Sequence, residues 1–288
     1  MKLIDGKKIA NEIIQEIKDA IAKISGRKPE RKPGLAFILV GDNPASQTYV
    51  KAKKKACAEV GIQSHLLEFP STIGQEDLLH QIELLNQNPA IDSILVQLPL
   101  PSHINEQVVT MTIDPAKDVD GFHPLNVGKI LLGNESAILP CTPHGIQVLL
   151  QKSHIPVSGK HVVIVGRSNI VGKPLAAILM QKKPGANATV TVCHSQSSNL
   201  PEILQSADIL VAAIGQPGFI KKDMVRKGVV VIDVGINRSD GKIVGDVDFK
   251  NVAEVASYIT PVPGGVGPMT IAMLLQNTLS IYARSRIL

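Results

Sequence analysis

The 288-residue sequence predicts an α/β protein built from two domains. Its length corresponds to about two domains of ordinary size. Its strand-like segments, such as HVVIV at residues 161–165 and GVVVIDV at residues 228–234, are apolar throughout rather than alternating. Uninterrupted apolar strands separated by segments of helical periodicity are typical of a parallel sheet covered by helices on both faces. Hydrophobic residues make up 44% of the chain, which excludes an intrinsically disordered protein.

The predicted elements alternate along the chain. We expect strands at residues 35–40, 65–69, 93–98, 161–165, 189–193, 209–214 and 229–234. We expect helices at residues 45–60, 76–86, 144–151, 172–180 and from 268 to about 284. A further amphipathic helix opens the chain, with isoleucines at positions 9, 13, 14, 17 and 21 on one face. Residues 25–34 are expected to form an exposed basic loop, and residues 99–133 an irregular stretch.

The prolines at positions 140 and 143 indicate a domain boundary. The first predicted domain spans residues 1–140, and the second spans residues 141–267. The C-terminal helix, residues 268–288, is expected to pack back on the first domain.

A phosphate-binding turn is predicted where the strand at residues 161–165 meets a helix. Gly166 follows the strand and Gly172 opens the helix. Backbone N–H groups of such a turn, together with the helix N-terminus, can hold a phosphate. The spacing departs from the strict GxGxxG pattern, so a tight turn that binds nothing remains the alternative.

The residues after the next strand favour NADP over NAD. An NAD site usually has Asp or Glu at this point to bond the ribose hydroxyls, but here TVTVC is followed by His194 and Ser195. The phosphate-binding turn offers Arg167, whose guanidinium suits a ribose phosphate. A surface arginine and a turn serine are the alternative.

Tyr49 and Lys53 lie four residues apart and therefore share one face of the predicted helix. A lysine becomes a usable acid or base when desolvation or neighbouring cations lower its pKa. Neighbouring lysines and a cationic substrate would both act in that direction. The alternative is a solvated basic face made of Lys51, Lys53, Lys54 and Lys55.

Three further segments contain candidate residues. Gln97 ends an apolar strand, where α/β sheets bind ligands, or it caps a loop carbonyl. Asp118 and Asp120 form a turn or supply a carboxylate to an amino-substituted heterocycle. Gly264 and Gly265 permit close approach to a flat ligand, or they only open the last helix.

Several function classes receive no support. The histidines and cysteines show no zinc-ligand spacing, so no metal is expected. Aromatic residues are only 3% of the chain and the net charge is +5, which argues against nucleic-acid binding through the Lys51–Lys55 run. No apolar run is long enough for a membrane span. The three scattered cysteines and the absence of a signal-peptide core favour the cytoplasm.

Seven stretches together resemble the bifunctional methylenetetrahydrofolate dehydrogenase/cyclohydrolase family. In family order they are YVKAKKKACAEVGI, VQLPLP, PAKDVDGFHPLNVGKI, PCTPHGI, VIVGRSNIVGKP, DVGIN and TPVPGGVGPMTIAML. The resemblance implies an N-terminal α/β folate-binding domain and a Rossmann-like NADP-binding domain, with a cleft between them, usually in a homodimer. It implies oxidation of 5,10-methylenetetrahydrofolate to the 5,10-methenyl form with NADP, followed by hydrolysis to 10-formyltetrahydrofolate.

The resemblance also implies residue roles. Lys53 is the catalytic lysine, Tyr49 lines the pterin pocket, Gln97 positions the lysine and Asp120 anchors the pterin ring. The implied cofactor contacts are Gly166, Arg167, Ser168, Ser195 and Ile236. The implied substrate contacts are Tyr49, Lys53, Val96, Gln97, Leu98, Asp120, Pro263, Gly264 and Gly265. The alternative is an NADP-dependent dehydrogenase of another small acid, which would not require these groups together.

Overall fold

A computed structural model describes residues 1–25, 31–239 and 241–285 and divides the chain into two compact units. Unit 1 comprises Met1–Asn11, Ile130–Glu135 and Pro140–Thr270. Unit 2 comprises Glu12–Lys129, Ser136–Leu139 and Ile271–Leu288. The division falls inside two long helices, α1 (Gly6–Ser25) and α10 (Val266–Arg284). The predicted α/β class with two domains is confirmed, whereas the predicted limits at residues 140 and 267 stay a prediction.

Unit 1 contains a six-stranded parallel sheet. Its strand order is β1 (Lys2–Leu3), β11 (Tyr258–Ile259), β8 (Val230–Asp233), β7 (Ile209–Ala212), β5 (His161–Val165) and β6 (Thr189–Cys193). From β5 the chain goes first to β6 on one side and then to β7 on the other. The strand order therefore reverses between β5 and β7, and ligands bind at such switch points beyond the carboxyl ends of the strands.

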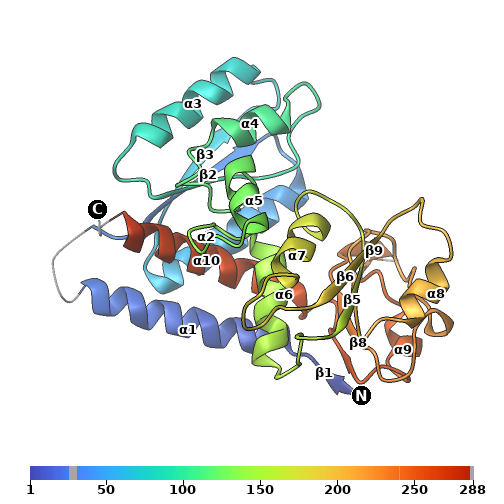
Figure 1. Cartoon of the computed structure of the whole chain (residues 1–288). Coiled ribbons are helices and arrows are strands. Elements are labelled where there is room, and N and C mark those ends of the chain that lie inside the picture. The colour runs from blue at the N-terminus through green and yellow to red at the C-terminus, as the bar shows by residue number, and fades with distance from the viewer. Residues whose placement is uncertain (26–30, 240, 286–288) are drawn as a thin grey trace. The chain divides into compact units, whose positions relative to one another are not determined.

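Helices cover both faces of this sheet, as the apolar strands predict (Figure 1). On one side lie α6 (Cys141–Lys152) and α7 (Gly172–Leu179), and on the other lie α8 (Leu200–Gln205) and α9 (Phe249–Val252). The second side holds an apolar cluster that joins Val163 and Leu210 of the strands to Leu204 and Val252 of the helices. Unit 1 also contains a short antiparallel pair, β9 (Asn237–Ser239) with β10 (Lys242–Val244), and a 3-10 turn at Lys222–Met224.

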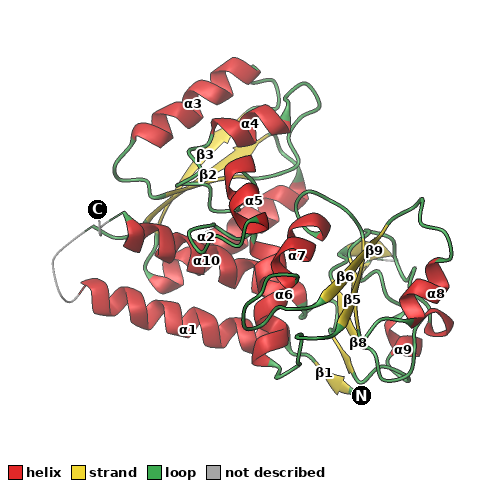
Figure 2. Cartoon of the chain, in the orientation of Figure 1, coloured by secondary structure: helices red, strands yellow, loops and turns green. Residues whose placement is uncertain are grey.

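Unit 2 contains a three-stranded parallel sheet, drawn in yellow in Figure 2. Its order is β3 (Gln63–Phe69), β2 (Gly34–Val40) and β4 (Ser93–Val96). The helices are α2 (Pro44–Val60), α3 (Gln75–Gln87), α4 (Glu106–Thr112) and α5 (Pro124–Leu131), whose last two residues belong to unit 1. Ala36, Ile38 and Val40 of the central strand pack against Leu78 and Ile82 of α3. All seven residues of β2 are buried, which explains the uninterrupted apolar run.

The predicted stretches at residues 161–165 and 189–193 coincide with β5 and β6. Other expectations were wrong in detail. The irregular stretch 99–133 contains α4 and α5, and α4 begins where the Asn105 side chain accepts hydrogen bonds from the backbone N–H groups of Gln107 and Val108. The strand predicted at residues 93–98 ends at Val96. Strands β1, β9, β10 and β11 are two or three residues long, too short for a periodicity to predict.

Residues 26–30 of the predicted basic loop and residues 286–288 of the predicted last helix lie outside the described residues. At the end of that loop, Gly34 is buried and begins β2, so the loop is shorter than predicted. None of the described helices has both the length and the apolar character of a membrane span.

Candidate functional site

Lys53 and Gln97 meet in unit 2. Helix α2 places Lys53, and it starts where the Asn43 side chain accepts hydrogen bonds from Ala45 and Ser46 N–H groups. Gln97 follows directly after β4. The Lys53 Nζ donates a hydrogen bond to Gln97 Oε1 over 3.1 Å. Two predicted site residues that are 44 positions apart are therefore in contact.

Gln97 is held in one orientation by its other bonds. Its Nε2 donates to the Leu98 carbonyl at 2.7 Å, so its oxygen is the atom left to face the lysine. Its backbone N–H donates to the Ile38 carbonyl at 2.9 Å, which extends the pairing with β2 beyond the last residue of the strand. The amide therefore holds the Lys53 amine through its oxygen without adding a charge.

Two residues of α2, Tyr49 and Cys57, flank Lys53 by one helical turn on either side. Tyr49, one turn before it, is 42% exposed, so its ring is open to a ligand. Cys57, one turn after it, is fully buried, and this burial raises the pKa of the thiol to about 12. The thiol stays protonated near neutral pH and offers no anion to the amine.

Asp120 lies in the turn after Val119, next to β4. Ile94 of β4 and Asp118 form an isolated parallel bridge, which ties this turn to the edge of the sheet. Asp120 is half-buried, Val96 is buried and Leu98 is half-buried. The predicted unit 2 contacts thus come from α2, from the end of β4 and from the turn beside β4.

Unit 1 has a cavity of about 530 Å³ at its switch point. Gly166 follows β5 in a left-handed conformation with φ of +127°, which favours glycine. A Cβ atom there would lie 2.2 Å from the Ala213 carbonyl oxygen, because Ala213 follows β7. A Cβ atom on Gly172 would lie 2.0 Å from the Gly166 oxygen. Both glycines of the predicted phosphate turn are therefore required by close backbone packing.

Three of the predicted cofactor residues, Gly166, Arg167 and Ser195, line this cavity. Among the described residues that line it, none is Asp or Glu. The predicted Ser168 is placed differently: its Oγ accepts hydrogen bonds from the Val171 and Gly172 N–H groups where α7 begins. Its hydroxyl therefore supports the turn.

Sequence reasoning missed other lining residues, namely His194, Ser197, Leu200, Ile214, Gln216 and Phe219. Their signal was their position: they follow β6 and β7, whose carboxyl ends lie at the same edge as that of β5. The rule used for Gly166 also applies to them.

Two buried carboxylates support the segment that contains Ile236. Asp246 accepts hydrogen bonds from the N–H groups of Ile214 and Gly215 and from Asn237 Nδ2. Asp233 accepts hydrogen bonds from three further N–H groups, those of Gly235, Asp246 and Val247. Ile236 itself is 51% exposed, so its side chain is available to a ligand.

The predicted glycine loop lies in unit 1. Gly264 has φ of +107°, and its carbonyl accepts a hydrogen bond from the Lys7 N–H at 3.0 Å. A Cβ atom on Gly6 would lie 1.9 Å from the Gly265 oxygen. Pro263 is exposed beside them. The structure thus places Pro263, Gly264 and Gly265 in unit 1, and Lys53, Gln97 and Asp120 in unit 2.

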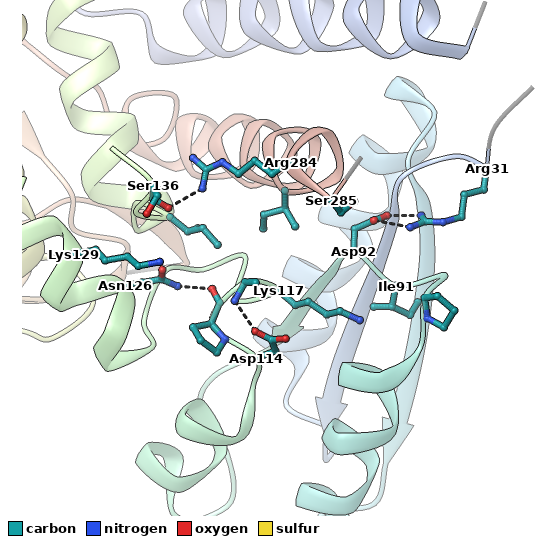
Figure 3. Close-up of a pocket in the computed structure, with 15 residues that line it drawn as sticks. Arg31, Ile91, Asp92, Asp114, Lys117, Asn126, Lys129, Ser136, Arg284 and Ser285 are labelled. Carbon is teal, nitrogen blue, oxygen red and sulfur yellow. Dashed lines mark hydrogen bonds and ion pairs between the residues drawn. The ribbon is translucent and has the colours of Figure 1, made fainter. Parts of the chain in front are cut away.

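A larger cavity, of about 640 Å³, lies in unit 2 and is lined by none of the predicted site residues (Figure 3). Several of its polar groups are paired with other protein groups. The Arg31 guanidinium donates to both carboxylate oxygens of Asp92, at 2.6 and 2.7 Å. Lys117 Nζ donates to the Leu85 and Asn88 carbonyls, and burial lowers the pKa of this lysine. These contacts stabilise unit 2.

Two family models match this chain. Residues 4–120 match the family model for the tetrahydrofolate dehydrogenase/cyclohydrolase catalytic domain, and residues 140–286 match the model for its NAD(P)-binding domain. The bifunctional protein FolD of Prosthecochloris aestuarii is 56% identical over 293 residues, covering 99% of both proteins.

Solved structures agree as well. The FolD methylenetetrahydrofolate dehydrogenase/cyclohydrolase of Campylobacter jejuni superimposes with a TM-score of 0.95 at 50% identity, covering 99% of each chain. The Trypanosoma brucei enzyme, solved with NADP and an inhibitor, has a TM-score of 0.92 at 40% identity, covering 98% of this chain and 97% of that one. The alternative of a dehydrogenase for another small acid receives no support. The chain therefore belongs to the tetrahydrofolate dehydrogenase/cyclohydrolase family.

Proposed function

We propose that the protein oxidises 5,10-methylenetetrahydrofolate to 5,10-methenyltetrahydrofolate with NADP, and then hydrolyses this product to 10-formyltetrahydrofolate. It is a bifunctional enzyme of one-carbon metabolism. The observation that supports this most directly is the Lys53–Gln97 hydrogen bond of 3.1 Å, which presents one oriented amine beside a half-exposed tyrosine.

The residues of the unit 1 cavity fit NADP. The closely packed turn at Gly166 leaves no room for a side chain, as expected where a backbone approaches a phosphate. Arg167 and Ser195 supply a cation and a hydroxyl for the ribose phosphate, and no carboxylate among the described lining residues repels it. When bound, NADP⁺ takes up the hydride that leaves the one-carbon group of the substrate.

In the hydrolytic step, water adds to the methenyl carbon and the ring then opens. Water addition needs a proton acceptor and ring opening needs a proton donor. Lys53 supplies both, because its amine takes a proton from the attacking water and returns it to the leaving ring nitrogen. Gln97 holds that amine in place through its oxygen. Asp120 adds the negative charge that anchors the pterin and favours the positive methenyl group.

The remaining predicted residues shape the two binding sites. Tyr49 lines the pterin pocket, and Val96 and Leu98 flank Gln97 at the end of β4. Pro263, Gly264 and Gly265 contact the folate, and Ile236 and Ser168 belong to the cofactor site. On this assignment, residues 1–140 together with the C-terminal helix bind folate, and residues 141–267 bind NADP.

The protein is further proposed to be a cytoplasmic homodimer, as the family resemblance and the scattered cysteines indicate. Light scattering coupled to size-exclusion chromatography should give twice the chain mass of 30.8 kDa. A mass of one chain would contradict the dimer and leave the activity untouched.

One assay tests the reaction. The protein is incubated with methylenetetrahydrofolate and either NADP⁺ or NAD⁺, and reduced nicotinamide is followed. Methenyltetrahydrofolate is then supplied without cofactor, and its disappearance is followed. We expect reduction with NADP⁺ and cofactor-independent hydrolysis. Reduction with NAD⁺ alone would contradict the role given to Arg167.

Lys53→Met tests the proton transfer. The variant should lose methenyl hydrolysis and keep NADP binding, since Lys53 lies in unit 2 and the cofactor cavity lies in unit 1. Lys51→Met is the matched control, because it removes an exposed lysine from the same helix. Full hydrolysis in Lys53→Met would remove Lys53 from the mechanism.

A further inference from the structure

The turn that contains Asp120 is built on the side chain of Asp118. The Gly121 N–H donates to the Asp118 carbonyl at 3.3 Å and to its Oδ1 at 3.1 Å. Gly121 has φ of +69°, a conformation that glycine adopts without strain. An aspartate at the first position of a turn and a glycine at the fourth suit a β-turn. Asp120 is the third residue of this turn.

The carboxylate of Asp118 is fully engaged on the protein side. It is 2% exposed, and its Oδ2 accepts hydrogen bonds from the His123 N–H at 2.8 Å and from Asn126 Nδ2 at 3.1 Å. Burial raises the pKa of Asp118, and these donors oppose that rise. Such a buried carboxylate is tolerated because several donors compensate its desolvation. It therefore acts on the turn and does not reach a ligand itself.

Other bonds hold the same segment from outside. Asn126 also donates to the Pro115 carbonyl at 2.9 Å, the bond drawn from Asn126 in Figure 3. Asn277 of α10 donates to the Val119 carbonyl at 2.9 Å. The backbone is thus fixed immediately before Asp120, at Val119, and immediately after it, at Gly121.

We propose that Asp118 is a positioning residue for folate binding, which holds Asp120 in place through the N–H groups of Gly121 and His123. This inference rests on the proposed function, in which Asp120 anchors the pterin. It gives the two aspartates of the DVD segment separate tasks. Asp118 faces inward and shapes the turn, and Asp120 meets the substrate.

Asp118→Asn tests the proposal with little change in side-chain size. The new amide removes the negative charge and turns one accepting oxygen into a donor that faces donors. We expect the KM for methylenetetrahydrofolate to rise about 10- to 100-fold, the range for hydrogen bonds to charged groups. The Kd for NADP should not change, because the cofactor cavity lies in the other unit.

Asp114→Asn is the matched control. Asp114 also accepts a hydrogen bond in the same loop, from the Ala116 N–H at 2.8 Å, but it does not bond the turn around Asp120. Its folate KM should equal that of the unchanged protein. Asn126→Ala is a second variant, which removes one donor to Asp118 and keeps the carboxylate, and it should raise the folate KM in the same direction.

The outcomes separate clearly. A folate KM that is unchanged in folded Asp118→Asn overturns the proposal, as does a rise matched by an equal rise in the NADP Kd. If Asp118→Asn does not fold, an unchanged KM in folded Asn126→Ala overturns it. Failure of the proposed function is distinguishable, because the unchanged protein would then turn over no folate and Asp120→Asn would not alter folate binding.

Discussion

The Asp233 carboxyl is expected to make the protein less stable as the pH rises from 4 to 7. Asp233 ends β8, is 3% exposed, and accepts hydrogen bonds from three backbone N–H groups. Burial raises its pKa to about 6 in spite of those bonds, and the nearby charge of Asp246 adds to the rise. The carboxyl therefore holds its proton more tightly in the folded chain than in the unfolded chain.

The size of the effect follows from that pKa. The rise from 3.8 to about 6 is close to two units, and at 1.36 kcal/mol per unit it corresponds to about 3 kcal/mol. Because the folded-state pKa is the higher one, the stabilising contribution is complete below pH 4. It is lost as the pH passes through 6.

The assay compares the unchanged protein with Asp233→Asn by urea denaturation between pH 4 and pH 7.5, followed by far-UV circular dichroism. From pH 4 to pH 7.5, the free energy of unfolding of the unchanged protein should fall by about 3 kcal/mol relative to that of the variant. Asp223→Asn, an exposed aspartate of the same unit, reports the effect of losing one surface charge. If the difference in free energy of unfolding between the unchanged protein and Asp233→Asn does not vary with pH, the pKa of Asp233 is not raised by folding.

Two further predictions concern unit 2. Gln97→Leu removes the hydrogen bond to Lys53, and since bonds to charged groups contribute about 1.5–3 kcal/mol, kcat for methenyl hydrolysis should fall about 10- to 100-fold. Absorbance of the methenyl compound measures this, and an unchanged kcat would show that Lys53 needs no support from Gln97. Arg31→Ala deprives Asp92, whose side chain is 1% exposed, of its cation. The free energy of unfolding, measured by urea denaturation, should drop by about 3 kcal/mol. A drop below about 1 kcal/mol would show that this ion pair contributes no more than an exposed surface pair.

Candidate residues could be singled out from the sequence where residue type and local position coincide. Gly166 stands directly after an apolar strand, and Tyr49 and Lys53 lie one helical turn apart, so local pattern alone marked them. Gln97 followed from its place after a buried strand. Lining residues such as Gln216 were missed because nothing in their chemistry stands out, and only their position beyond β7 brings them to the cavity.

The sequence by itself determined the class of fold and the bounds of β5, because a strand covered on both faces is apolar along almost its whole length, and this signal is local. The tertiary structure alone decided which groups meet. The orientation of the Gln97 amide is set by its hydrogen bond to the Leu98 carbonyl. Strand β1 forms only because it pairs with β11, where Lys2 lies opposite Tyr258, 256 positions further along the chain. The buried setting of Asp118 was equally invisible, since the donors that meet its carboxylate, among them Asn126, are brought to it by the fold. Hydrogen bonds between residues that are distant in the sequence leave no periodic trace in a chain, so only the folded coordinates contain them.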